Sequence, residues 1–477
     1  MTTRAHRATP AVSVIVLNYN GAELVRKCVE HLLVQTFEDY EIIVVDNASS
    51  DGSDDVLRAY EADERVRVVW SKENCGVPGG RNVGLEHARG DIIAFVDNDG
   101  YPAPTWLENA VRMFRDDSVG AVASLVFFNK KKIIVNGAGG TLNLRGYGGD
   151  HCFHASYEFA NIPTDVLYPM GCGMLIRRAT MDEIGPFDDI IFNYYDDVEL
   201  GIAVWNAGKR VVVCPEAWID HEYGSSTTTN HQKVYLCERN RIRTVFKFFP
   251  LRHLPFWFFH EYEILRYLRI AGLRDIPLRA WGWNLRHLGS ALAMRRRRKV
   301  DPGRYWGLFA RTWKQYPAPL PEEHVPEVPP RPTSAHVSVE TGDHAESLLY
   351  GWYPAEHDGR RAFRWATAAA SVLIRLEQPV SRLNITAISP REAQHVQLVA
   401  RRLGELTPVW QSPLATLTQA WSTQTINCEI GPGTYELQLI SDRPVVDSIG
   451  RPLGMGLGSL TLETADPLTT AATTSSS

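Results

Sequence analysis

The chain has 477 residues, of which 44% are hydrophobic and 22% are charged, an ordinary composition for two or three folded domains. Its 50 Lys and Arg residues are balanced by 55 Asp and Glu residues, which argues against nucleic acid as a partner. Seven scattered cysteines without a C-x-x-C pair argue against a disulfide framework or a structural zinc site and predict a cytoplasmic location. No apolar stretch has the length of a membrane-spanning helix or of a signal-peptide core.

The first hundred residues predict alternating strands and helices. The strand-like runs VSVIVLN, EIIVVDN, VRVVW and DIIAFVD are separated by helix-like stretches, the last of which runs toward His87. Repeated β-α units with short connections predict a mostly parallel sheet covered by helices. Ligands of such sheets bind outside the carboxyl ends of the strands. The polar groups Asn18 and Asn20, Asp46, and Asp97 with Asp99 all follow strands at that edge.

The segment FVDNDGYP at residues 95–102 places two carboxylates one residue apart at the end of a buried strand. In extended backbone, residues i and i+2 point to the same side, so Asp97 and Asp99 are expected to face one point. Two anions held together favour a divalent cation between them. The alternative is a solvated turn, because Asp, Asn and Gly are the commonest turn residues.

The rest of the chain predicts further domains. Residues 102–225 are mixed, with a glycine-rich irregular stretch to Asp150, a strand at MLIRR and a helix that starts near Asp196. A proline-rich linker and alternating apolar and polar residues then predict an antiparallel β-sandwich. The expected divisions are an N-terminal tail (1–10), an α/β domain (11–230), a helical extension (231–316), a linker (317–334), a β-sandwich (335–465) and a disordered tail (466–477).

Five motifs in this order carry a resemblance to a known family. They are VSVIVLNYNG, EIIVVDNASSDGS, ENCGVPGGRNVG, the Asp97–Asp99 pair, and IGPFDDIIFNYYDDVELGIAVWNAG with His221 downstream. This set resembles the inverting GT-A glycosyltransferases of family 2, especially the bacterial rhamnosyltransferase-like and galactofuranosyltransferase-like members, over about residues 11–250. The resemblance implies a GT-A sheet domain that moves a sugar from a nucleoside diphosphate-sugar to a hydroxyl of a glycan or lipid-linked glycan, as in cell-surface polysaccharide or O-antigen synthesis. The C-terminal part resembles a β-domain appended to some bacterial glycosyltransferases.

The resemblance also implies roles on the donor side of the site. Asp99, Asp97 and His221 would hold Mg²⁺ or Mn²⁺, and Asp97 would also contact the ribose or metal-bound water. Asp46 would accept a hydrogen bond from the nucleobase, and Arg81 would serve a phosphate or base. The alternatives are that Asp46 is a cap or turn residue, that the glycine-rich run is a tight turn before a helix, and that His221 is structural. The full set of expected donor-side residues is Asn18, Asn20, Asp46, Asn74, Gly80, Arg81, Asn82 and Asp97.

On the acceptor side, the acidic pair before Val-x-Leu implies Asp197 as the general base and Asp196 as a residue that positions acceptor or base. Inversion by direct displacement requires one such base. A helix N-terminus lowers the pKa of a carboxylate and burial raises it, and the sequence leaves open which effect is larger. The alternative is that both aspartates only cap the helix.

Two other functions fit parts of the sequence. A sugar nucleotidyltransferase should carry a G-x-G-x-R loop after the first strand, where this chain has VIVLNYNGAE. A non-catalytic glycan-binding protein on the same scaffold would have no need of Asp46, Asp97, Asp99, Asp197 and His221 together.

Two aromatic regions have open interpretations. HLPFWFFHEYEILRYL and the later MRRRRKV predict either a peripheral contact with anionic lipid, at the inner face of the plasma membrane, or a buried helical layer with a solvated basic face. In the β-sandwich, the tryptophans either stack on sugars or belong to the core. They are Trp352, Trp365, Trp410 and Trp421.

Overall fold

The computed structural model divides the chain into two compact units. Unit 1 comprises residues 1–129, 136–153 and 161–317, and unit 2 comprises residues 130–135, 154–160 and 318–477. The residues that the structure describes are 9–128, 131–153, 157, 160, 162–222, 230–270, 275–309, 336–338, 352–358, 362–366, 369–391, 394–402, 408–441, 445–446, 452–453 and 455–464. The expected linker (317–334) and C-terminal tail (466–477) lie outside these residues, as does the expected N-terminal tail up to residue 8.

A nine-stranded sheet in the order β3-β2-β1-β4-β10-β6-β11-β5, with β7 paired to β6, forms the centre of unit 1. Its strands β1 to β4 are parallel where they pair, as are β6 and β11, whereas β10 runs antiparallel to β4 and β6, and β5 antiparallel to β11. The strands are β1 (Val12–Asn18), β2 (Tyr40–Asp46), β3 (Val66–Trp70), β4 (Ile92–Asp97), β5 (Gly100–Pro102), β6 (Val119–Phe128), β7 (Lys131–Ala138), β10 (Met174–Arg177) and β11 (Arg210–His221). The stretch expected to be irregular up to Asp150 instead contains β7 and a hairpin of β8 (Gly140–Leu142) and β9 (Gly148–Asp150).

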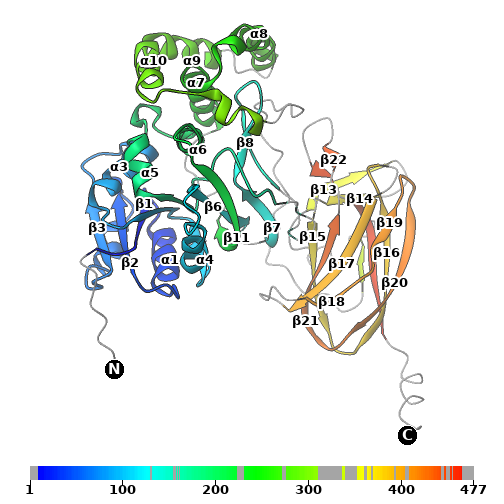
Figure 1. Ribbon diagram of the computed structural model, residues 1–477. Coiled ribbons are helices and arrows are strands. Elements are labelled where there is room, and N and C mark those ends of the chain that lie inside the picture. The colour runs from blue at the N-terminus through cyan, green and yellow to red at the C-terminus, as the bar shows by residue number, and fades with distance from the viewer. Residues whose placement is uncertain are drawn as a thin grey trace. The chain divides into compact units, whose positions relative to one another are not determined.

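Helices cover both faces of this sheet (Figure 1). Val12, Val14 and Val16 of β1 share a core with α1 and α4, because alternate strand residues point to one face. The opposite face of β1 meets α3, where Ile15 lies under Gly84. The helices are α1 (Ala22–Leu33), α2 (Ser53–Arg58), α3 (Gly76–His87), α4 (Trp106–Met113), α5 (Arg178–Ile184) and α6 (Asp196–Asn206).

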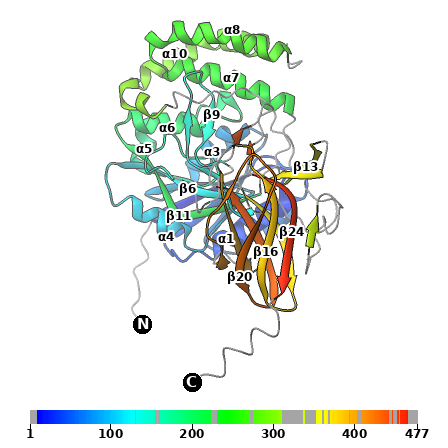
Figure 2. The same ribbon diagram turned by 90° about the vertical axis from the view of Figure 1, so that its right-hand side faces the viewer.

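The C-terminal part of unit 1 is a layer of four helices (Figure 2). They are α7 (Asn230–Phe248), α8 (Leu254–Ile270), α9 (Asp275–Arg286) and α10 (Leu288–Arg297). The helix α7 contributes Ile242 and Val245 to a core that it shares with Val198 of α6, Trp257 of α8 and Ala280 of α9. None of the helices in the described ranges is both long and apolar enough to cross a bilayer.

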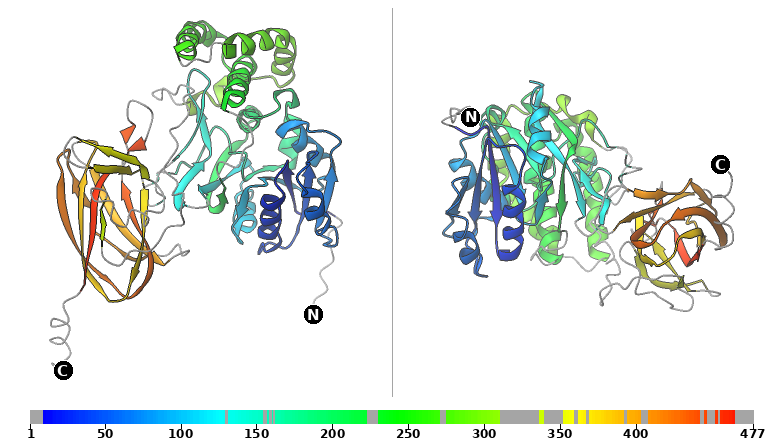
Figure 3. Two further views of the ribbon diagram at one scale, coloured as in Figure 1. Left: turned by 180° about the vertical axis from the view of Figure 1, so that it is seen from behind. Right: turned by 90° about the horizontal axis from the view of Figure 1, so that it is seen from below.

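Unit 2 contains two main antiparallel sheets that enclose one apolar core (Figure 3). One sheet has the order β13-β14-β24-β16-β20 with β12 on β24, and the other the order β15-β21-β17-β18 with β19 on β17. The strands are β12 (His336–Ser338), β13 (Trp352–His357), β14 (Ala362–Ala366), β15 (Ala369–Leu376), β16 (Val380–Ile388), β17 (Gln394–Arg402), β18 (Pro408–Gln411), β19 (Ala415–Leu417), β20 (Ser422–Ile430), β21 (Gly433–Ser441), β22 (Val445–Val446), β23 (Pro452–Leu453) and β24 (Gly456–Thr464).

The predicted fold class is confirmed: a mostly parallel α/β domain is followed by helices and antiparallel sheets. The three described tryptophans of unit 2 are partly buried and pack on other side chains of the protein. Trp410 packs against the core. Trp365 and Trp421 each lie 5.4 Å, between ring centroids, from Phe363 and are half-buried. The side chain of Trp352 lies outside the described part of the structure.

Candidate functional site

Strand register brings the first group of predicted site residues to one edge of the sheet. In the parallel pairing of β1 with β2, Asn18 lies beside Asp46, and in the pairing of β1 with β4, Leu17 lies beside Asp97. All three strands end here, so their last polar side chains share the carboxyl edge where α/β sheets bind ligands.

Asp46 is fixed at this edge by neutral hydrogen-bond donors. The Asn18 side-chain amide donates to Asp46 Oδ1 at 3.0 Å, and the Ser49 backbone N–H donates to Asp46 Oδ2 at 3.0 Å. Asn18 is fully buried, and its own Oδ1 accepts a 2.8 Å hydrogen bond from Asn98. Asn18 therefore orients Asp46, while each oxygen of Asp46 keeps a second lone pair for a ligand.

Asn20 and Asn74 hold the loops on either side of Asp46. Asn20 has a left-handed backbone, with φ of 50°, and its Oδ1 accepts from the Ser50 N–H at 2.8 Å. Asn74 Oδ1 accepts from Asn47 Nδ2 at 3.0 Å and from the Gly76 N–H at 2.9 Å, where α3 begins. Asn20 and Asn74, which were both expected on the nucleotide-sugar side of the site, thus make hydrogen bonds that hold these two loops.

The expected donor-binding loop around Gly80 is part of α3. A Cβ atom on Gly80 would lie 2.3 Å from Leu17 Cδ1, so this glycine lets the helix approach β1 and not a ligand. Asn82 is also committed to the protein, because its Nδ2 donates to Phe187 O at 3.0 Å and its Oδ1 accepts from the Phe187 N–H at 2.9 Å. The expected ligand contacts of Gly80 and Asn82 are replaced by packing contacts.

Arg81, also on α3, joins the two sides of the candidate site. Its guanidinium is only 3% exposed, and it donates to Asp196, to Asp97 Oδ1 at 2.9 Å and to the Gly171 carbonyl at 3.1 Å. Both terminal nitrogens of Arg81 donate hydrogen bonds within the protein, so the side chain orients carboxylates. The expected contact of Arg81 with a phosphate or base would require these bonds to change. Burial, with the nearby Asp99, raises the pKa of Asp97, and Arg81 opposes this effect.

Asp99 and His221 meet because β5 and β11 pair. Their antiparallel register sets His221 beside Gly100, and the Glu222 N–H donates to Asp99 O at 2.9 Å. His221 Nε2 then lies 3.4 Å from Asp99 Oδ1, and its Nδ1 lies 2.7 Å from Asn136 Oδ1. Burial lowers the pKa of His221, but the hydrogen bond to Asp99 and the nearby carboxylates outweigh it and raise the pKa overall.

The three residues expected to bind the metal, Asp97, Asp99 and His221, do not form one group. Within the described part of the chain, no three His, Cys, Asp or Glu side chains are grouped closely enough to hold a metal ion. The strand β4 ends at Asp97, and Asn98 and Asp99 form a turn, so the extended backbone on which the same-side prediction rested stops too early. Asp97 faces Arg81, and Asp99 faces His221. The carboxylate of Asp99 and the imidazole of His221 fit a divalent cation that takes its other ligands from a diphosphate and water.

Asp197 lies at the first turn of α6, on the other side of Arg81. Its Oδ2 accepts from the Gly171 N–H at 3.1 Å and its Oδ1 from the Val198 N–H at 2.8 Å. Burial first, and then the neighbouring Asp196 and Asp150, raise the pKa of Asp197 to about 7, although Arg81 and the Val198 N–H lower it. Burial therefore has a larger effect on the pKa of Asp197 than the hydrogen bond from the Val198 N–H in the first turn of α6.

The backbone before Asp196 adopts an unusual conformation. Phe192, Tyr194 and Tyr195 all have positive φ angles, 62°, 66° and 72°, which non-glycine residues rarely adopt. The side chain of Asn240 on α7, fully buried, donates to the carbonyls of Ile191, Asn193 and Tyr194 at 2.7–3.0 Å, and Arg239 also donates to Ile191 O. This helix therefore holds the loop that presents Asp196 and Asp197.

Sequence reasoning missed three side chains near the predicted ones: Asn136, Asp150 and Asn240. Asp150 ends β9, and burial raises its pKa to about 6 even though a hydrogen bond from Tyr168 and the nearby His221 lower it. The β-branched run IIV in KKIIVNGA could have revealed the strand that carries Asn136. Asn240 stands as a lone amide among arginines in a helical stripe, a weak signal.

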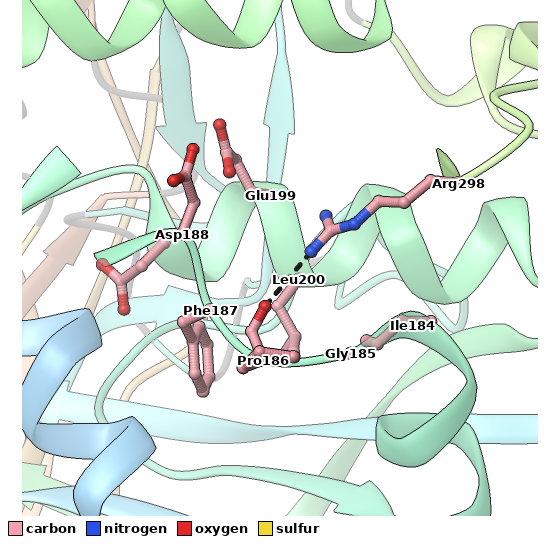
Figure 4. A pocket seen from close by; sticks show the side chains of 9 residues that line it. Ile184, Gly185, Pro186, Phe187, Asp188, Glu199, Leu200 and Arg298 are labelled. Carbon is pink, nitrogen blue, oxygen red and sulfur yellow. Dashed lines mark hydrogen bonds between the residues drawn. The ribbon is translucent and has the colours of Figure 1, made fainter. Parts of the chain in front are cut away.

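A small cavity is lined by residues 184–188 and by Asp196, Glu199, Leu200 and Arg298 (Figure 4). Its volume is about 10 Å³, and its walls include Asp188, Glu199 and Arg298, which donates to the Pro186 carbonyl at 3.3 Å. Such a volume holds about one water molecule. This cavity lies where the end of α5 meets α6, and it is too small for a sugar.

A carboxylate-lined edge on a mostly parallel sheet can bind a ligand such as a nucleotide, and comparison with known proteins finds glycosyltransferases that are similar to part of this chain. Residues 13–185 match the family model "Glycosyl transferase family 2". This similarity covers the sheet edge with Asp46 and Asp97, and residues 186–477 lie outside it.

Curated relatives match parts of the same region. The chain is 37% identical over 182 residues to "Glycosyltransferase AglE" of Haloferax volcanii, a match that covers 37% of this chain and 56% of the relative. It is 40% identical over 111 residues to "Putative glycosyltransferase EpsH" of Bacillus subtilis, covering 23% of this chain and 32% of the relative. The chain therefore spans between about a third and about half of the length of these relatives.

Among solved structures, a mannosyltransferase from Pyrobaculum calidifontis, PcManGT, in complex with GDP-Man and Mn²⁺, is 21% identical, with a TM-score of 0.38, and the match covers 62% of this chain and 83% of that one. GalNAc-T7 with UDP, GalNAc and Mn²⁺ is 14% identical, with a TM-score of 0.45, and the match covers 78% of this chain and 70% of that one.

Proposed function

We propose that this protein is an inverting, divalent-metal-dependent glycosyltransferase that moves a sugar from a nucleoside diphosphate-sugar to a hydroxyl of a growing glycan. The observation that carries the proposal is the position of Arg81 between Asp97 of the donor edge and Asp196 of the acceptor loop. Arg81 and Asp196 are buried and Asp97 is half-buried, so these charges are costly to hold at this position unless they are paired. The match of residues 13–185 to the family 2 glycosyltransferase model supports this proposal over a sugar nucleotidyltransferase.

On the donor side, Asp46 would accept a hydrogen bond from the nucleobase, and Asp97 would face the ribose or metal-bound water. Asn18, Asn20, Asn74 and Ser49 would keep these groups in place.

Asp99 and His221 would hold Mg²⁺ or Mn²⁺, with Asn136 orienting the imidazole. When bound, such a cation stabilises the negative charge that develops on the leaving diphosphate. Asp99 and His221 would hold the cation in the neighbourhood of Asp97.

On the acceptor side, Asp197 would take the proton from the acceptor hydroxyl while that oxygen forms a bond to the anomeric carbon and the bond to the diphosphate breaks. A pKa of about 7 suits a general base at neutral pH, since the group is then both ionised and basic enough to accept a proton. Asp196 would position Asp197 through Arg81.

The acceptor would be a cell-surface polysaccharide, an O-antigen or a lipid-linked glycan. All seven cysteines are free, which supports a reducing, cytoplasmic location.

Two variants in one experiment test this proposal. Thermal unfolding with nucleoside diphosphates and Mn²⁺ should show stabilisation of the wild type by one base, about 2.7 kcal/mol at a ligand concentration 100 times the Kd. Asp99→Ala should lose the Mn²⁺-dependent part of this effect and all turnover. Asp197→Asn should keep it, while turnover falls by about 10²–10⁴.

The exposed Asp117→Asn serves as the control and should match the wild type in both measurements. A normal metal response in Asp99→Ala would remove the metal site, and equal loss of binding and turnover in Asp197→Asn would deny it the role of base.

A further inference from the structure

Among its described side chains, the helix α8 presents large apolar groups outward, and it buries Glu261 together with Trp257 and Ile264. Its buried face carries Glu261, only 4% exposed, whose two oxygens accept from Arg241 of α7 at 2.7 and 3.0 Å. Its outward face carries Phe259 and Tyr262, each 71% exposed. A helix that faces water normally carries charged and polar side chains on its outward face. The outward face of α8 is therefore better suited to an apolar neighbour than to water.

The apolar surface continues onto α9. Leu278, Trp281 and Leu285 follow each other at spacings of three and four, so they form one stripe along that helix. Trp281 stacks on Phe258 of α8, with ring centroids 5.8 Å apart, while Leu278 is 76% and Leu285 63% exposed. We call the exposed set, Phe256, Phe258, Phe259, Tyr262, Leu278 and Leu285, the outer aromatic face. Figure 2 shows α8 as the outermost helix of the layer, with α7 between it and the sheet.

Basic side chains lie next to this face in the sequence. Arg252 precedes α8 and Arg286 follows Leu285, and both are exposed. Asp275 is the exposed acid of α9, and it is paired with Arg279 at 3.1 Å. The excess charge next to the apolar face is therefore positive.

We propose that the outer aromatic face docks on a lipid bilayer that carries anionic headgroups. Aromatic side chains favour the boundary between headgroups and acyl chains, and arginines beside them bind phosphate, the combination found in interfacial helices. A second copy of this chain is a poorer occupant, because a twofold contact through this face would bring arginines of like charge together.

Docking here would also place part of the candidate site near the lipid. Trp257 of α8 donates to the Arg145 carbonyl at 3.0 Å, and His253 contacts the Leu144 carbonyl at 3.0 Å. These carbonyls belong to the turn of the hairpin whose second strand, β9, ends at Asp150. The layer that binds lipid is thus connected directly to the hairpin beside Asp197.

Vesicle flotation of the full chain tests the proposal. The wild type should float with vesicles of phosphatidylcholine and phosphatidylglycerol, and more weakly with phosphatidylcholine alone or at high salt. The double variant Phe259→Ser with Tyr262→Ser should partition at least about tenfold less, because two exposed aromatic side chains no longer enter the lipid. Arg286→Gln should weaken binding to the anionic vesicles alone.

Val34→Ser removes a similarly exposed apolar side chain from the end of α1 and should float as the wild type does. The double variant should keep the thermal response to nucleotide, so failure of lipid binding is separable from failure of the proposed function. Absence of flotation, or equal flotation of the double variant, would overturn the proposal. So would a concentration-dependent dimer, seen by light scattering, that the double variant abolishes while vesicles bind neither protein.

Discussion

The donor edge and the acceptor loop reach the same site by different means. At the donor edge, Asn18, Asp46 and Asp97 directly follow parallel strands, so the register of the sheet puts them together. In the acceptor loop, Asp196 and Asp197 follow a backbone with three left-handed non-glycine residues, and Asn240 of a distant helix holds that backbone. The first is a consequence of secondary structure, and the second depends on tertiary contacts.

This difference predicts how each region responds to substitution. Changes at the donor edge should affect nucleotide binding without disturbing the loop, whereas changes in α7 should affect turnover through the loop and leave the nucleotide in place. Arg81 is the exception, because it belongs to both regions.

Arg81→Gln should therefore have the largest effect, since it removes the charge between Asp97 and Asp196. Breaking a buried ion pair costs about 3–5 kcal/mol, because the remaining charges stay desolvated and unpaired. We expect lower thermal stability of unit 1 and the loss of both nucleotide binding and turnover.

Arg26→Gln is the matched control for this substitution. Arg26 also bridges two carboxylates, Glu23 and Glu30, but on the exposed surface of α1. It should leave stability and both activities almost unchanged, since exposed ion pairs contribute little. If Arg81→Gln lost turnover alone, the two regions would not be coupled through this side chain.

The sequence predicted the donor edge well because its information is local. Strand ends, turn residues and the order of the motifs indicate where Asp46 and Asp97 lie. The partners of these residues could not be predicted in the same way. Arg81 reaches Asp97 because Gly80 and Gly84 let α3 lie close to β1, and sequence reasoning had expected Gly80 to contact a ligand.

The acceptor loop was predicted less completely, for a physical reason. The acidic pair and the helix after it have a periodic signal, but the conformation of residues 192–195 is set by hydrogen bonds to a side chain more than 40 residues away. Likewise, the antiparallel insertion of β10 between β4 and β6 depends on pairing across long separations, which an alternating pattern does not encode.

Asn240→Ala should have an intermediate effect that separates the two regions. It removes the side-chain amide that donates to three loop carbonyls, of which Ile191 O keeps a second donor in Arg239. Leaving buried carbonyls without a partner lowers the free energy of unfolding by about 1–3 kcal/mol. We expect kcat to fall by about ten- to a hundredfold, because a small displacement of a catalytic group has an effect of this size, with little change in the affinity for the nucleotide.

Asn284→Ala is a close control for this helical layer. Asn284 is also buried and also donates to two carbonyls, of Arg239 and Ala280, but it does not touch the loop. It should lower stability similarly while kcat stays near the wild-type value. Equal loss of kcat in both variants would mean that Asn240 acts only through general stability.

The smallest expected effect is a shift in the pH dependence of kcat, which tests whether Asp197 or Asp150 is the general base. Both carboxylates have raised pKa values, about 7 for Asp197 and about 6 for Asp150. A general base works in its ionised form, so kcat should fall as the pH drops below the pKa of that base. The negative charge of Asp150 raises the pKa of Asp197, and Asp150→Asn should therefore move the acidic limb of the kcat profile to lower pH.

At pH 7 the rise in kcat from this shift is at most about twofold, because a group with a pKa near 7 is already about half ionised there. The measurement is a kcat profile at saturating donor between acidic and neutral pH, compared with that of the wild type. A collapse of kcat at every pH in Asp150→Asn would instead make Asp150 the base. The general base would then lie on the β8–β9 hairpin and not on the loop that α7 holds.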